Sequence, residues 1–158
     1  MMKPPRSNYA QRLRGFPGVV FDEEGAACQR GAWQRLFRDR IGADFNGRIV
    51  LEIGCSDASL LSAVAARHPD TAFIGIDWKY KAIHDGGVRI AASGLPNVAL
   101  VRGRGQAIAT MFGGGEISEI WIFHPDPCDR DIELPNRLMG EVFLADAHKV
   151  LRDGDSMI

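Results

Sequence analysis

Three acidic side chains lie in or just after apolar runs that read as buried strands, where they could bind and orient a polar ligand. Glu52 lies in "LEIGC", Asp77 ends "FIGID", and Asp126 stands between two prolines in "FHPDP". Proline restricts its own backbone and that of the preceding residue, so the carboxylate of Asp126 would be held in place. Such a carboxylate can orient a nucleophile or accept its proton. A strand-terminating turn is the alternative, because Pro and Asp are both turn residues.

The stretch after the first apolar run, "EIGCSDAS", reads as a ligand-binding turn. Gly54 allows a tight turn and a close approach of a ligand to the backbone. The dinucleotide fingerprint G-x-G-x-x-G is absent. The pattern is closer to the E/D-x-G-x-G-x-G of S-adenosylmethionine sites, with Ser56 and Ala58 in place of two glycines. Both are small, but a positive φ would be strained at either residue. An ordinary strand-to-helix turn is the alternative.

Other candidate cofactor residues follow the later apolar runs. Asp77 lies 23 residues after Gly54, a spacing that suits a carboxylate accepting hydrogen bonds from ribose hydroxyls, although Asp is also a common helix N-cap. Arg104, in "RGRGQ", stands where an adenine-recognising group would lie, or is a loop arginine in solvent. The remaining candidates, which lie at or just beyond the ends of the predicted strands, are Cys55, Trp78, Gln106 and His124.

The elements that must position these residues alternate regularly from residue 48 onward. Apolar runs over 48–55, 69–77, 94–103 and 117–123 predict strands, and the stretches 57–68, 79–93, 106–112 and 136–151 predict helices. This alternation predicts an α/β fold with a doubly wound, Rossmann-like, mostly parallel sheet. In such sheets ligands bind beyond the carboxyl ends of the strands, where the strand order reverses.

The chain divides into three predicted parts. Residues 1–24 read as an irregular basic arm, 25–47 as an amphipathic helix and loop, and 48–158 as the α/β domain. Residues 152–158 start what should be a fifth strand, so we expect the domain to lack its final strands. An exposed strand at that edge would invite pairing, which predicts a homodimer.

Composition sets the broad class. The chain has 158 residues, 46% apolar and 25% charged, which suits one globular domain. Its net charge is -1, but residues 1–48 carry +4 and residues 49–158 carry -5, which indicates either a phosphate-bearing partner or a solvated surface. Three widely spaced cysteines indicate neither a disulfide framework nor a zinc site. Without an apolar run long enough for a membrane, we expect a cytoplasmic protein without metal.

Five pieces of the sequence together resemble bacterial tRNA (guanine-N7)-methyltransferase. They are "LEIGC", "FIGID", "LPNVALVRG", "FHPDP" and "NRLMGEVFLADAHKVLRDGD", in the family's order and spacing. The resemblance implies a class I methyltransferase fold, S-adenosylmethionine as cofactor and tRNA as substrate. It implies that Glu52 and Asp77 bind the cofactor, that Asp126 is catalytic, and that Arg130 and Arg137 contact substrate.

The sequence departs from this family in ways that keep other functions open. Where relatives have a basic run after Pro-Asp-Pro, this chain has "DRDIEL", so the methyl acceptor can be tRNA, another RNA or a different molecule. Cys128 follows Pro127, as in pyrimidine C5-methyltransferases that use a cysteine nucleophile. The altered glycine loop also suits a cofactor-binding or scaffolding domain without catalysis.

Overall fold

The computed structural model describes residues 6–123, 125 and 137–158. The helices are α1 (Arg6–Leu13), α2 (Glu23–Cys28), α3 (Trp33–Ile41), α4 (Ser59–Ala65), α5 (Tyr80–Ser93), α6 (Ile108–Met111) and α7 (Glu141–Val150), with 3₁₀ turns at Gly42–Asp44 and Gly105–Ala107. The strands are β1 (Val20–Asp22), β2 (Ile49–Ile53), β3 (Ala72–Asp77), β4 (Val98–Arg102), β5 (Ile117–Trp121) and β6 (Leu151–Met157).

The strands form one six-stranded sheet in the order β1-β4-β3-β2-β5-β6, and every pair is parallel. The order runs outward in one direction from β2 through β3 and β4, and in the other through β5 and β6. The strand order therefore reverses between β2 and β5, the place where a ligand is expected in a doubly wound sheet. This confirms the predicted fold class.

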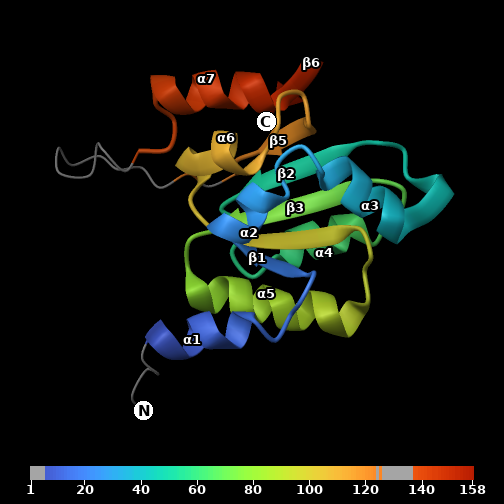
Figure 1. Cartoon of the computed structure of the whole chain (residues 1–158), viewed down its shortest axis with the longest axis vertical. Coiled ribbons are helices and arrows are strands. Elements are labelled where there is room, and N and C mark those ends of the chain that lie inside the picture. The colour runs from blue at the N-terminus through green and yellow to red at the C-terminus, as the bar shows by residue number, and fades with distance from the viewer. Residues whose placement is uncertain (1–5, 124, 126–136) are drawn as a thin grey trace.

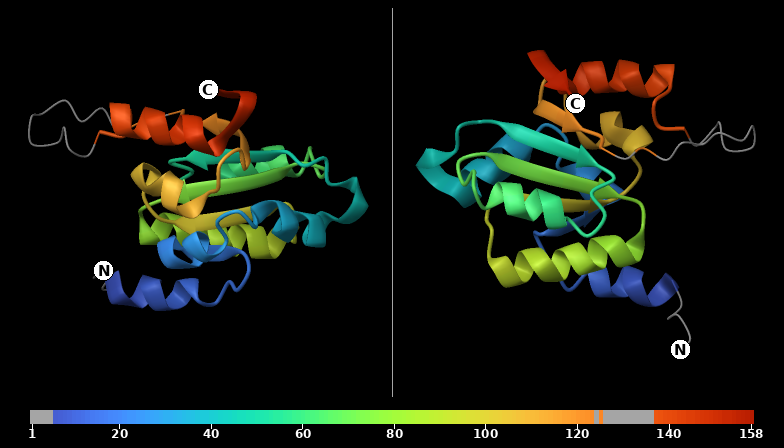
Figure 2. Two further views of the ribbon diagram at one scale, coloured as in Figure 1. Left: turned by 45° about the horizontal axis from the view of Figure 1, so that its top comes forward. Right: turned by 180° about the vertical axis from the view of Figure 1, so that it is seen from behind.

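Helices cover both faces of the sheet (Figures 1 and 2). One core cluster joins α2, α3, α6 and α7 to strand residues such as Leu51 and Ile74, and the other joins α1, α4 and α5 to residues such as Val50 and Phe73. Successive strand side chains point to opposite faces. Glu52 and Asp77 therefore share the α4–α5 face with Val50 and Phe73.

The N-terminal part is more ordered than the sequence predicted. The stretch 1–24, expected to be irregular, contains α1, which packs on α5, and β1, which pairs with β4 at the sheet edge. Residues 25–47, expected to hold one helix, contain most of α2 and all of α3, with Gly31 (φ 78°) in the turn between them. Both differences arise from contacts with distant residues, which local sequence patterns do not encode.

α5 continues through Gly86 and Gly87, which the sequence indicated as a weakness. A Cβ at Gly86 would lie 2.8 Å from Leu100, and one at Gly87 would lie 2.9 Å from Phe16. The absent side chains let α5 pack closely against β4 on one side and the segment after α1 on the other. This packing offsets the low helix propensity of glycine.

A buried carboxylate, Glu116, joins the N-terminal helices to the sheet. Its Oε1 accepts a hydrogen bond from the backbone N–H of Trp33 (2.8 Å), and its Oε2 accepts from Gly31 (2.9 Å) and Gly113 (2.7 Å). Glu116 is only 5% exposed, and its bond to Trp33 is buried, whereas the bonds to Gly31 and Gly113 are partly buried. A buried N–H that loses its acceptor costs about 1–3 kcal/mol.

We predict that Glu116→Ala lowers the free energy of unfolding by about 3 kcal/mol, because it removes the acceptor of three backbone N–H groups, of which that of Trp33 is buried. Chemical denaturation measures this change. Glu119→Gln is the control, because Glu119 lies three residues on, in β5, and bonds the half-exposed Arg48 at 3.3 Å, while the amide of Gln keeps an oxygen to accept from the indole N–H of Trp121. We expect it to cost less than about 1 kcal/mol. Equal losses in the two variants would contradict a special role for Glu116.

Candidate functional site at the carboxyl edge of the sheet

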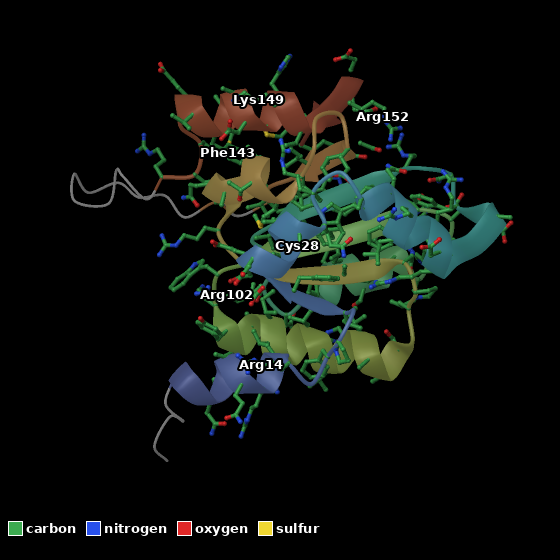
Figure 3. The ribbon with its side chains drawn as sticks, viewed as in Figure 1. Arg14, Cys28, Arg102, Phe143, Lys149 and Arg152 are labelled. Carbon is green, nitrogen blue, oxygen red and sulfur yellow. The ribbon has the colours of Figure 1, made fainter. Side chains whose placement is uncertain are left out.

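The residues predicted to bind a ligand gather where β2, β3 and β4 end. Glu52 lies in register with Gly75 on β3 and Trp121 on β5, and Asp77 lies in register with Arg102 on β4. Figure 3 shows Arg102 at this carboxyl edge, with Arg152 at the opposite side of the sheet. The parallel register thus brings side chains from four strands to one edge.

The loop after β2 has three residues in the left-handed region. Gly54 has φ 84°, Ser56 has φ 52° and Ala58 has φ 57°. The strain predicted for Ser56 and Ala58 is therefore present. A Cβ added at Gly54 would meet nothing within 4 Å, so the backbone there faces open space. Close approach of a ligand to this turn is sterically allowed.

Asp77 ties this loop to the end of β3. Its Oδ2 accepts a hydrogen bond from the backbone N–H of Ser56 (3.1 Å), and its Oδ1 accepts from Lys79 (2.9 Å). α5 begins at Tyr80 with Lys79 as its N-cap, so Asp77 does not occupy the N-cap position. A carboxylate has about four acceptor positions, so two remain for a ligand's hydroxyl groups.

Glu52 is a buried carboxylate at the centre of the site. Its side chain is 5% exposed, and its buried Oε2 has no hydrogen-bond partner. Burial raises the pKa of Glu52 from 4.5 to about 7, because the charged form loses its hydration. An orphaned polar atom at a strand end indicates a site where a polar or cationic ligand would supply the missing partner.

Cys55 fills space under the loop. It is 5% exposed, and a Cβ at Gly75 would lie only 2.7 Å from its Sγ. Burial raises the pKa of the Cys55 thiol, and the carboxylates of Asp77 and Glu52 raise it further. A thiol kept protonated in this way is a packing residue and a poor nucleophile.

A further carboxylate, that of Glu23, lies beside the loop after β4. The sequence did not indicate it. The Oε1 of Glu23, the first residue of α2, accepts a hydrogen bond from the backbone N–H of Arg104 at 2.9 Å. "FDEEG" reads locally as a polar turn, so only the pairing of β1 with β4 reveals that Glu23 reaches this edge.

Aromatic rings and cations surround the same edge. Trp78 is 47% exposed, and the Nζ of Lys79 lies 5.7 Å from its ring centroid. The guanidinium of Arg102 lies 4.0 Å from the ring centroid of Tyr80. Exposed aromatic faces of this kind can stack on a planar base.

The remaining predicted residues divide into two groups. Arg104 and Gln106 are exposed just after β4, and Arg137 is exposed shortly before the start of α7. His124, Asp126 and Arg130 lie outside the described residues, as does Cys128. The predicted catalytic role of Asp126 therefore stays a prediction.

The described part of the chain contains neither a candidate metal site nor a candidate membrane span. No group of three or more His, Cys, Asp or Glu residues in it could hold a metal ion. Among the described helices, none has the length and apolarity needed to cross a bilayer.

Sequence comparisons show similarity to known methyltransferases. A family described as "Putative methyltransferase" matches residues 46–158. A tRNA (guanine-N(7)-)-methyltransferase of Cytophaga hutchinsonii is 31% identical over 123 residues, covering 78% of this chain and 53% of the relative. One of Christiangramia forsetii is 37% identical over 109 residues, covering 69% and 49%. The chain thus spans about half the length of these curated relatives.

Solved structures support the same fold. The antibiotic-resistance methyltransferase Kmr matches with a TM-score of 0.58 at 21% identity, covering 80% of this chain and 64% of that one. The aminoglycoside resistance methyltransferase NpmB1 matches with a TM-score of 0.59 at 20% identity, covering 81% and 64%. At these identities the likeness establishes the fold alone.

We predict that Glu52 makes the protein less stable as pH rises. Between pH 4.5 and about 7 the folded state holds a proton on Glu52 that the unfolded state has lost, so the free energy of unfolding falls across this window. Glu52→Gln removes this term and should be more stable than the parent by up to about 3 kcal/mol at pH 8.

Denaturation of both proteins from pH 4.5 to 8 measures this difference. The two should be nearly equal at the low end, where Glu52 is neutral in the folded state and still about half protonated in the unfolded state. A stability difference that does not change with pH would contradict the prediction.

We also predict that Ser56→Gly stabilises the free protein by ~0.5–1 kcal/mol. The left-handed conformation costs a non-glycine residue about 1–2 kcal/mol, and the greater freedom of unfolded glycine returns part of the gain. Thermal or chemical denaturation measures the effect. Ser59→Gly, three residues on at the start of α4, is the matched control and should be destabilising. Destabilisation by Ser56→Gly would show that the loop is not strained.

Proposed function

Because the chain belongs to this methyltransferase family, we propose that it transfers a methyl group from S-adenosylmethionine to N7 of a guanine in tRNA. The observation that carries the proposal is the carboxylate of Asp77, which holds the loop after β2 at the point where strand order reverses. The choice of acceptor rests on the relatives, which are tRNA (guanine-N(7)-)-methyltransferases.

The described residues fit the cofactor. Asp77 keeps free acceptor positions for ribose hydroxyls, and the turn at Gly54 leaves space for a ligand against the backbone. The unpartnered Oε2 of Glu52 would gain a partner from the cofactor's charged amino acid part or from water around it. Trp78 offers an exposed ring for the adenine base. Cys55 supports the loop from below.

The chemistry asks mainly for positioning. When bound, S-adenosylmethionine supplies an electrophilic methyl group. Guanine N7 already carries a nucleophilic lone pair, so the chain's residues need only hold the base in line with that group. We assign this task to Asp126, with Arg130 and Arg137 as substrate contacts. Glu52 and Asp77 hold the cofactor's end of the arrangement, and no metal takes part.

The acceptor is the finer part of the proposal. "DRDIEL" is net negative, but Lys79, Arg102 and Arg104 lie at the described part of the carboxyl edge and can contact phosphates. Exposed Trp78 and neighbouring Tyr80 add rings on which an unpaired base can stack. We therefore retain tRNA as acceptor, in a reducing cytoplasmic setting.

Two alternatives can be separated from this proposal. A cysteine mechanism at Cys128 predicts a covalent adduct with a fluorinated pyrimidine, and normal turnover by Cys128→Ser would rule it out. A domain without catalysis would bind the cofactor but transfer no methyl group. The homodimer remains a prediction, and it concerns β6, which lies at one edge of the sheet.

We predict that the protein binds S-adenosylmethionine and that Asp77→Asn weakens binding about 10- to 100-fold, because charge-assisted hydrogen bonds to the ribose are lost. Titration calorimetry measures the affinity. Asp70→Asn is the control, since exposed Asp70 precedes β3 at the opposite edge. The absence of binding at millimolar cofactor would refute the proposed function.

We further predict that Asp126→Asn keeps cofactor affinity but lowers methyl transfer to tRNA by about 100-fold or more. Transfer of labelled methyl groups to unmodified tRNA, followed by identification of N7-methylguanine, measures the activity. Parent protein that binds the cofactor but methylates no tRNA would favour another acceptor or a binding domain. Full activity in Asp126→Asn would remove this residue from the mechanism.

A further inference from the structure

We propose that Glu23 accepts a hydrogen bond from the exocyclic amino group of the cofactor's adenine ring, and so selects adenine over other bases. Glu23 precedes residues 46–158, which the methyltransferase family matches. The inference rests on the proposed function, because it assigns one part of the same S-adenosylmethionine site to a side chain from the N-terminal segment.

The register of three neighbouring strands places Glu23 at the site. Asp22 on β1 lies beside Arg102 on β4, which lies beside Asp77 on β3. One residue further along each strand come Glu23, Gly103 and Trp78, which form a row past the carboxyl ends. Strands lie about 4.8 Å apart, so the positions of Trp78 and Glu23 are separated by about 10 Å, with a glycine between them.

Contacts fix the carboxylate of Glu23 in this row. Its Oε1 accepts from the backbone N–H of Arg104 at 2.9 Å, and a Cβ at Gly103 would lie 2.7 Å from its Cγ. The backbone N–H of Gly103 in turn donates to the carbonyl oxygen of Asp77 at 3.1 Å. Glu23 is therefore held against the same short loop that adjoins the ribose-binding candidate.

The chemistry of the row suits a planar base with an amino group at its edge. Trp78 provides an exposed aromatic face, and the absence of a side chain at Gly103 lets the side chain of Glu23 lie directly against the loop after β4. Within the described residues, the Oε2 of Glu23 accepts no hydrogen bond, so the carboxylate retains acceptor capacity. A base bound beside the ribose at Asp77 would extend along this row toward Glu23.

A carboxylate distinguishes adenine from hypoxanthine because it can only accept. The amino group of adenine donates to it, whereas the 6-oxo group of hypoxanthine would place an oxygen against an oxygen. The loop after β4, "RGRGQ", contains no acid of its own. Glu23, the first residue of α2, supplies an acceptor beside this loop from a different part of the chain.

Calorimetric titration of the whole chain with S-adenosylhomocysteine and with its 6-oxo analogue, S-inosylhomocysteine, tests the inference. We expect the parent protein to prefer the adenine ligand by about tenfold or more. Glu23→Gln should bring this ratio close to one, because an amide can donate to the 6-oxo group. It also keeps an oxygen to accept from Arg104, so the loop is preserved. Glu24→Gln, the exposed neighbour in α2, should retain the parent ratio.

Each outcome has a defined meaning. A ratio that collapses in Glu23→Gln but not in Glu24→Gln supports the inference. An unchanged ratio in Glu23→Gln overturns it while the proposed function stands, and so does a parent protein that binds both ligands equally. A parent protein that binds neither ligand at millimolar concentration removes the proposed function and this inference together.

Discussion

The site depends on one hydrogen bond between the loop after β2 and the end of β3, from the backbone N–H of Ser56 to the Oδ2 of Asp77. The loop after β2 must turn sharply at Gly54 before α4 begins, and Ser56 and Ala58 take left-handed conformations that disfavour side chains. The charge-assisted hydrogen bond that Ser56 donates to the buried carboxylate of Asp77 offsets part of this cost. The same carboxylate also accepts from Lys79, so the starts of α4 and α5 are both positioned by Asp77.

A second carboxylate places the N-terminal segment relative to this site. Glu116 lies at the amino end of β5, and its three backbone donors fix the turn between α2 and α3 and the loop after α6. With α3 packed through Trp33 and Phe37 on one face of the sheet, β1 can pair with β4 and end beside Arg102. Glu23 then reaches the carboxyl edge. Packing at one end of the sheet thus determines which side chain reaches the other.

Sequence reasoning found the central sheet because its signal is local. Each buried strand is a short apolar run followed by a turn, and the spacing from Gly54 to Asp77 reflects one strand–helix–strand unit. β1 was not predicted, because its three residues, "VFD", carry no periodicity and pair with a strand about 80 residues away. The roles of Glu116 and Glu23 were not predicted for a similar reason. Their roles come from contacts across the fold, and nothing adjacent to them in sequence indicates those contacts.

The fold shows where part of the positive charge of the N-terminal segment lies. α1 packs along α5, and Tyr9 lies 5.4 Å from His84, between ring centroids, in the second turn of α5. The excess positive charge of residues 1–48 is therefore partly carried by Arg12 and Arg14, on and just after a helix that packs against α5. If tRNA is the acceptor, as proposed, phosphate contacts can also come from the N-terminal segment. The acidic stretch "DRDIEL" then changes where the RNA is held without removing the electrostatic attraction that RNA binding requires.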